Sequence, residues 1–147
     1  MGAKRKATAT WTGDLASGSG TVDLTSSGAV AGLPVSWAAR TEDNAGGKTS
    51  PEELIAAAYA SCFCMALSVG LTRGGHKPDR LDVAAESTFE KVGEGFAFTT
   101  LHVNVRGNVP GIDAAAFKEA AEGASQNCPV SKALKGNVKI TVDAELV

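Results

Sequence analysis

The chain has 147 residues, of which 44 % are hydrophobic and 20 % are charged, and its formal net charge at pH 7 is −2. This length and composition predict one soluble globular domain over residues 1–147, with a hydrophobic core of its own. The near-neutral charge argues against nucleic acid or an anionic membrane as the main partner. The basic cluster at residues 3–6 is expected to be a solvated tail.

The N-terminal sequence MGAKRKATATWTG is positively charged but has no apolar region, so no secretory signal is predicted. The chain has three cysteines, Cys62, Cys64 and Cys128, an odd number without the spacing of a disulfide framework. We therefore expect a cytoplasmic protein with reduced thiols.

The first third of the chain predicts three short strands. Residues 4–28 alternate polar and apolar side chains and are interrupted by glycines, which indicates a strand, a turn and a second strand. The segment LPVSWAART, residues 33–41, predicts a third strand with Val35 and Trp37 on one face. Arg40 would then lie at the end of that strand, just before a loop.

A long helix is predicted next, with clear signals at both ends. Ser50 can serve as N-cap, Pro51 suits the first helical position, and Glu53 completes the S-x-x-E pattern of a capping box. The helix should run to Arg73 and end at Gly74–Gly75, a length of roughly 35 Å at 1.5 Å per residue.

This helix has no charged side chain between residues 54 and 71. Such a run approaches the ~20 apolar residues that a bilayer requires, so a membrane span is one interpretation. The other is a central helix buried on all sides. We favour burial, because the run is rich in Ala and Ser and the other elements have soluble patterns.

The second half of the chain predicts two long strands, two helices and a final strand. The strands lie within residues 80–107 and are joined by a hairpin at 93–95. Asp113 should cap one helix, Pro129 should begin a short one, and residues 138–147 alternate as a strand. The order βββ-α-ββ-α-α-β predicts an α+β fold with a largely antiparallel sheet.

The cysteines differ in their predicted surroundings. Cys62 and Cys64 are about 200° apart around the helix, so they cannot bridge to each other or readily bind one metal ion, and one should face the packed interior. Cys128 precedes a helix that begins with Pro129, where backbone N–H groups favour a thiolate; the alternative is a thiol that serves as a weak N-cap.

A thiolate in apolar surroundings requires a cation, because desolvation raises the pKa of a thiol. Arg40 is the best candidate, since a guanidinium stays charged even when buried. Glu52 could hold Arg40 through a bidentate pair. The alternatives are a surface arginine at a strand end and an acid that complements the helix dipole.

The segment TSPEELIAAAYASCFCMALS, together with NCPVSKAL, PGID and WAART, resembles the OsmC branch of the OsmC/Ohr family of thiol peroxidases over essentially the whole chain. The resemblance implies an α+β fold in which a largely antiparallel sheet wraps a long central helix. It also implies an intertwined homodimer with an active site at each end of the interface.

The resemblance further implies the roles of four residues. Cys62 is implied as the cysteine that attacks an organic hydroperoxide and becomes sulfenic acid, and Cys128 as the one that resolves it to an intramolecular disulfide. Arg40 and Glu52 match the pair that activates the thiolate and polarises the peroxide. Cys64 is interpreted as a packing residue. Electrons would come from a dithiol or a lipoylated protein, and neither a metal nor an organic cofactor is expected, since sulfur carries the redox change.

Helix geometry adds a prediction about assembly. Glu52 and Cys62 are ten residues apart on one helix, about 15 Å along its axis, so they cannot share a site within one subunit. We therefore predict an obligate homodimer with composite sites, with Arg40 also crossing over. An apolar lining should favour organic and fatty-acid hydroperoxides over hydrogen peroxide; its expected members are Ile55, Tyr59, Phe63, Met65 and Leu67.

Two other classes of function remain open on the sequence. One is a metal- or redox-sensing thiol protein without turnover, which would add His76 and His102 to the three cysteines, although neither histidine has ligand spacing. The other is a stress-induced structural protein whose thiols only fill the core.

Overall fold

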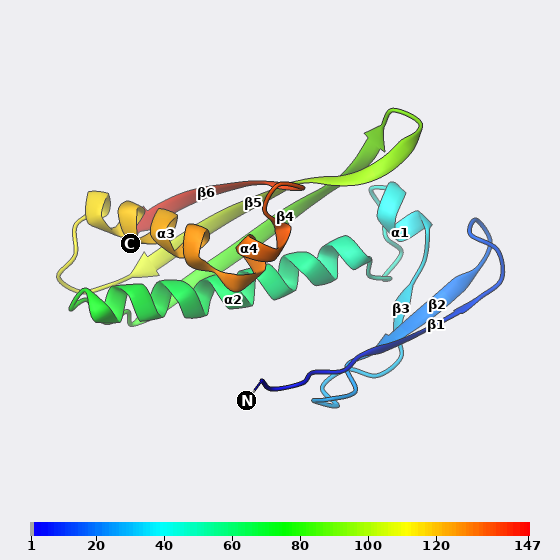
Figure 1. Ribbon diagram of the computed structural model, residues 1–147, viewed down its shortest axis with the longest axis horizontal. Coiled ribbons are helices and arrows are strands. Elements are labelled where there is room, and N and C mark those ends of the chain that lie inside the picture. Colours follow the sequence, from blue (N-terminus) through cyan, green and yellow to red (C-terminus); the bar gives the residue numbers. More distant parts are fainter. Residues whose placement is uncertain (1) are drawn as a thin grey trace. The chain divides into compact units, whose positions relative to one another are not determined.

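The computed structural model describes residues 2–147. Contacts within the chain form two compact units, which divide between residues 54 and 55. The helix α2, Pro51–Arg73, begins in the first unit and continues through the second (Figure 1). One domain over residues 1–147 remains a prediction, and the two units are described separately below.

The first unit contains a small antiparallel sheet of the order β1-β2-β3, formed by β1 (Thr8–Thr12), β2 (Ser19–Asp23) and β3 (Leu33–Val35). The predicted third strand was too long, because β3 ends at Val35 and a short helix, α1 (Ala38–Thr41), follows it. The Ser36 hydroxyl accepts a hydrogen bond from the Ala39 N–H at 3.2 Å, which favours a helical turn over extended backbone. Arg40 therefore lies on a helix and not at the end of a strand.

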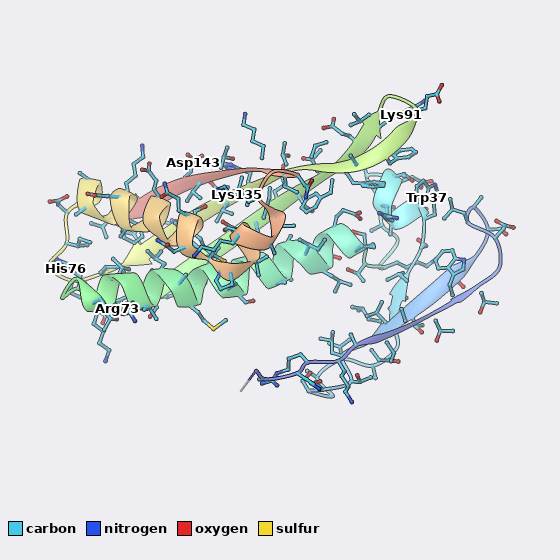
Figure 2. The ribbon with its side chains drawn as sticks, viewed as in Figure 1. Trp37, Arg73, His76, Lys91, Lys135 and Asp143 are labelled. Carbon is cyan, nitrogen blue, oxygen red and sulfur yellow. The ribbon has the colours of Figure 1, made fainter. Side chains whose placement is uncertain are left out.

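The helix α2 has the predicted bounds. The Ser50 hydroxyl accepts a hydrogen bond from the Glu53 N–H at 3.1 Å, as an N-cap should. The Glu53 carboxylate binds the Thr49 hydroxyl instead of completing a reciprocal capping box. At the other end, Gly75 adopts a φ of 86° and the His76 N–H donates to the last turn, so the chain leaves the helix there (Figure 2).

Only one face of α2 is buried, so the expectation of a helix buried on all sides was wrong for the single chain. The buried face repeats every three or four residues and consists of Ala56, Tyr59, Phe63, Leu67 and Leu71. On the opposite face Met65 is 63 % exposed and Val69 is 49 % exposed. By length and hydropathy α2 could cross a bilayer, although core helices of soluble proteins pass the same test; 28 % of its most apolar window is buried.

The second unit contains a three-stranded sheet of the order β4-β5-β6. The strands β4 (Arg80–Val92) and β5 (Gly95–Asn108) form the predicted antiparallel hairpin, with an irregularity between Thr88 and Phe89. The strand β6 (Lys139–Leu146) pairs with β5 in parallel. A parallel pair requires a crossover, which the two intervening helices provide (Figure 1).

These helices are α3 (Ala114–Asn127) and α4 (Pro129–Leu134). The Asp113 carboxylate caps α3 by accepting a hydrogen bond from the Ala116 N–H at 2.8 Å, as predicted. The core lies between one face of the sheet and the helices: Leu101, Val103 and Val105 from β5 pack with the buried face of α2 and with Phe117, Ala121 and Ala124 from α3. The predicted α+β class is confirmed.

Candidate active site

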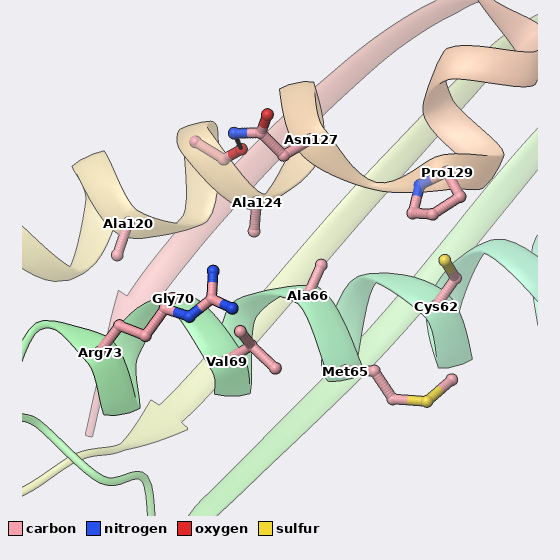
Figure 3. Close-up of a pocket in the computed structure, with 11 residues that line it drawn as sticks. Cys62, Met65, Ala66, Val69, Gly70, Arg73, Ala120, Ala124, Asn127 and Pro129 are labelled. Atoms are coloured by element: carbon pink, nitrogen blue, oxygen red, sulfur yellow. Dashed lines mark hydrogen bonds between the residues drawn. The ribbon is translucent and has the colours of Figure 1, made fainter.

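The structure brings together two of the three cysteines. The sulfur atoms of Cys62 and Cys128 lie 3.0 Å apart, although the residues are separated by 66 positions in the sequence. Cys62 comes from the middle of α2, and its side chain is directed toward Pro129 at the start of α4 (Figure 3). A disulfide bond is about 2.05 Å long, so the two sulfurs could bond after an approach of about 1 Å. Both cysteines are free thiols here.

Cys128 joins two helices, which fixes the position of its sulfur. Its N–H donates to the carbonyl of Ala124 at 2.8 Å and closes α3, whereas its carbonyl accepts from the N–H of Lys132 at 3.0 Å and opens α4. Pro129 occupies the first position of α4, where a missing N–H costs nothing. The free N–H groups of Val130 and Ser131 are therefore available to the Cys128 sulfur.

The two thiols have opposite ionisation tendencies. Burial raises the pKa of Cys62, and the hydrogen bond with Cys128 raises it further. Burial also acts to raise the pKa of Cys128, but the bond with Cys62, the N–H groups of Ser131 and Val130, and the Ser131 hydroxyl together lower it below its ordinary value. Of the two thiols, Cys128 is the one whose immediate surroundings already favour the thiolate.

Cys62 opens onto a groove of about 660 Å³ between α2 and α3. The sides of the groove are mainly apolar or small, and Arg73 stands at the end far from Cys62 (Figure 3). Its lining from α2 includes Met65, Ala66, Val69 and Gly70, and its lining from the α3 side includes Ala120, Ala124 and Asn127. The groove has room for an alkyl chain beside the Cys62 sulfur.

This lining differs from the one expected from the sequence. Tyr59, Phe63 and Leu67 have no exposed surface and pack in the core, so they line no groove. Of the five expected residues, Met65 is the one that lines the groove beside Cys62. The reason is the helical period, since Tyr59, Phe63 and Leu67 share one face of α2 and Met65 lies on another.

Arg40 and Glu52 form the predicted bidentate pair in the first unit. The guanidinium donates from Nη2 to Glu52 Oε1 at 2.7 Å and from Nε to Glu52 Oε2 at 3.2 Å. The Glu52 side chain is 8 % exposed and that of Arg40 is 29 % exposed. The guanidinium carbon also lies 5.4 Å from the centre of the Trp37 ring. Two elements, α1 and the first turn of α2, thus hold one orientation of the guanidinium.

Cys64 lies apart from the sulfur pair. It is half-buried and lines a different, more open pocket with Met65, Ser68 and residues 78–81. Burial raises the pKa of its thiol, and the charge of Asp82 adds to that effect. These surroundings agree with the interpretation of Cys64 as a packing residue, which remains a prediction.

The candidate metal ligands are dispersed in the described part of the chain. His102 binds Thr141 at 2.7 Å and Asp143 at 3.4 Å on β6, and His76 follows the end of α2. Within residues 2–147 no three His, Cys, Asp or Glu side chains are grouped so that they could hold a metal ion.

Sequence reasoning missed a set of buried hydroxyls beside Cys128. Ser131 Oγ lies 3.0 Å from Tyr59 Oη, and Tyr59 Oη lies 3.1 Å from Ser125 Oγ. A serine three positions after Cys128, in the first turn of a predicted helix, was the only available signal, since Tyr59 approaches it through the fold alone.

A family model described as OsmC-like protein matches residues 43–143, which includes both cysteines of the pair and Glu52. The chain belongs to the OsmC-like family. The resemblance noted in the sequence is thus confirmed, and it covers the α2, α3 and α4 segments that carry the sulfur pair.

Among the relatives of this OsmC-like chain is "Peroxiredoxin OsmC" of Escherichia coli strain K12, which is 42 % identical over 142 residues, 97 % of this chain and 96 % of the relative. An "organic hydroperoxide resistance protein" of Xanthomonas axonopodis pv. citri is 34 % identical and covers 66 % of this chain and 67 % of its own length. The crystal structure of the organic hydroperoxide resistance protein OhrB of Bacillus subtilis has a TM-score of 0.67 at 27 % identity, covering 95 % of this chain and 98 % of that one.

Proposed function

We propose that this OsmC-like protein is a cysteine peroxidase that reduces organic hydroperoxides to alcohols. The observation that carries the proposal is the Cys62–Cys128 sulfur pair, 3.0 Å apart, with Cys62 lining an apolar groove. The names of the relatives, a peroxiredoxin and an organic hydroperoxide resistance protein, indicate the enzyme class that the sequence predicted, a thiol peroxidase.

In the proposed reaction the Cys62 thiolate attacks the terminal oxygen of the hydroperoxide. The O–O bond breaks, the remaining alkoxide takes a proton and leaves as an alcohol, and Cys62 becomes a sulfenic acid. The Cys128 sulfur then attacks the Cys62 sulfur, the S–O bond breaks, and water leaves as the disulfide forms. A dithiol or lipoylated protein in the reducing cytoplasm would restore both thiols.

We propose that Arg40 and Glu52 complete the site from a partner subunit. A cation is needed near Cys62, because burial raises the pKa of its thiol. Glu52 is ten residues before Cys62 on α2, about 15 Å along the axis, which is too far for one subunit to use both at one sulfur. The uncharged, exposed face of α2 that carries Met65 and Val69 is available for a second copy.

The decisive experiment is a titration of the reduced protein with cumene hydroperoxide, followed by peptide mass spectrometry of the thiols. One equivalent should produce a disulfide between Cys62 and Cys128 and leave Cys64 free. Cys62→Ser should abolish alcohol production, and Cys128→Ser should accumulate sulfenic acid at Cys62. Cys64→Ala is the matched control and should behave as the unchanged protein.

Several results would contradict this function. Turnover retained in Cys62→Ser would exclude the proposed nucleophile. A single stoichiometric oxidation, without further turnover when a dithiol is supplied, would support the redox-sensing alternative. Equal or better kcat/KM with hydrogen peroxide than with cumene hydroperoxide would contradict the role of the apolar groove.

Assembly has its own test. We expect a dimer in sedimentation velocity, and Met65→Asp should weaken it because a charge would enter an apolar interface. Activity should fall together with the fraction of dimer as the protein is diluted. A monomer with full peroxidase activity would refute composite sites.

A further inference from the structure

The buried hydroxyls beside α4 form a continuous chain that ends at the Cys128 sulfur. Ser131 Oγ and Tyr59 Oη lie 3.0 Å apart, and Ser125 Oγ extends the chain at 3.1 Å. Tyr59 has no exposed surface and Ser131 is 7 % exposed. The hydroxyl and the N–H of Ser131 both bind the Cys128 sulfur. Buried polar groups require fixed partners, and these groups supply one another.

Access to the two sulfurs is unequal. Cys128 has no exposed surface, whereas Cys62 is partly exposed and lines the groove between α2 and α3. A thiolate that attacks a disulfide must reach the sulfur to which it will bond, and the other sulfur leaves with the electron pair. In an oxidised pair, an attacking thiol can therefore approach Cys62 through the groove but cannot approach Cys128.

We propose that Ser131 and Tyr59 are positioning residues that hold Cys128 as the leaving sulfur when the disulfide is reduced, so that the reductant attacks Cys62. The inference rests on the proposed function only for the way in which the disulfide arises. Neither residue touches the reductant, and both act through the Cys128 sulfur.

The exchange balances with a dithiol as the reductant. Its first thiolate bonds to the Cys62 sulfur, the Cys62–Cys128 bond breaks, and the electron pair goes to Cys128. The second thiolate of the dithiol then attacks the first, which releases Cys62 and leaves the dithiol as a disulfide. The two protons of the dithiol pass to the two cysteines. A leaving thiol departs faster when its thiolate is stabilised, which is the contribution of Ser131.

Tyr59 makes this contribution reversible. The Ser131 hydroxyl has one proton, which it donates to Tyr59 Oη in the structure. When Cys128 leaves as a thiolate, this proton can turn to the sulfur if Tyr59 donates to Ser131 in its place. The phenolic O–H can act in either direction, because Ser125 lies 3.1 Å away as a further partner.

The first test maps the attacked sulfur. The disulfide is prepared with diamide in a Cys64→Ala chain, which makes it independent of any hydroperoxide reaction. Glutathione is added as a monothiol probe, the freed thiol is trapped with N-ethylmaleimide, and peptides are analysed by mass spectrometry. We expect glutathione on Cys62 and maleimide on Cys128, in about tenfold excess over the reverse pattern, by analogy with a one-unit difference in pKa.

An equal or reversed pattern would overturn the inference, as would failure of diamide to join the two sulfurs. If diamide forms the disulfide and the expected pattern follows, but cumene hydroperoxide forms none, the proposed peroxidase function fails while the inference stands. The two failures are therefore distinguishable.

The second test measures the ionisation of Cys128 by ultraviolet absorbance of the thiolate against pH, in a Cys62→Ser, Cys64→Ala background. Ser131→Ala should raise the midpoint by about one pH unit, a tenfold loss of thiolate at lower pH. Tyr59→Phe, which keeps the ring in the core, should raise it by a smaller amount. Ser68→Ala, on α2 beside Cys64, is the control and should leave it unchanged. A midpoint unaffected by both test substitutions, or equally affected by the control, would refute the role of the hydroxyls.

Discussion

Replacing Glu52 by Gln tests the arginine–glutamate pair with the least change in shape. The Glu52 carboxylate is 8 % exposed and receives two N–H groups from Arg40, at 2.7 and 3.2 Å. Glutamine keeps the length and volume of the side chain. Its amide has one oxygen to accept from the guanidinium, and its NH₂ group would face a second donor.

The cost follows from this geometry. Loss of a hydrogen bond to a charged group costs about 1.5–3 kcal/mol, and separating a fully buried ion pair costs more. The Arg40 side chain is 29 % exposed, so solvent recovers part of the loss. We therefore expect Glu52→Gln to lower the free energy of unfolding by about 1–2 kcal/mol. Because the guanidinium would lose its fixed orientation, kcat/KM for cumene hydroperoxide should fall at least about tenfold.

The assay is urea denaturation at one protein concentration, combined with steady-state kinetics. Glu53→Gln is the matched control: it removes the neighbouring charge on the exposed side of α2, where Glu53 binds the Thr49 hydroxyl. A double-mutant cycle with Arg40→Gln should give a coupling energy of about 1 kcal/mol. Additive effects, or a loss in Glu52→Gln no larger than in the control, would show that the pair has no special role.

Three further predictions concern the second unit. Gly107→Ala should lower the free energy of unfolding by about 1–3 kcal/mol in urea denaturation, because a Cβ would lie 2.4 Å from the Phe117 ring. Asp113→Ala should cost about 1 kcal/mol in the same assay, since α3 would lose its N-cap. In a chain with Cys64 as its only cysteine, alkylation should reach half its maximal rate at a higher pH than a free cysteine does, because burial and Asp82 disfavour the thiolate; Asp82→Asn should lower that pH.

Patterns local in sequence predicted the long helix and the hairpin accurately. The bounds of α2 follow from Ser50, Pro51 and the glycines after Arg73, which act on backbone groups within one turn. The same local reasoning failed at α1, where the alternation of residues 33–37 indicated a strand and the Ser36 hydroxyl instead begins a helical turn. A short segment can satisfy both periods, and one hydrogen bond decides between them.

Features that depend on distant parts of the chain could not be predicted in this way. Alternation in residues 139–146 predicts a strand but not its direction, and β6 pairs in parallel because α3 and α4 carry the chain back across the sheet. The pairing of Cys62 with Cys128 was implied by the family resemblance alone. The hydroxyls of Tyr59 and Ser131 meet only after α4 has packed on α2.

The separation of the sulfur pair along the sequence links the redox state of the protein to its resistance to unfolding. Joining two positions 66 residues apart closes a large loop in the denatured chain. In the chain-entropy model this removes enough freedom from the unfolded ensemble to stabilise the fold by about 4 kcal/mol, provided that the cross-link introduces little strain. Each oxidation would therefore make the protein harder to melt and to digest, and each reduction would return it to a softer form.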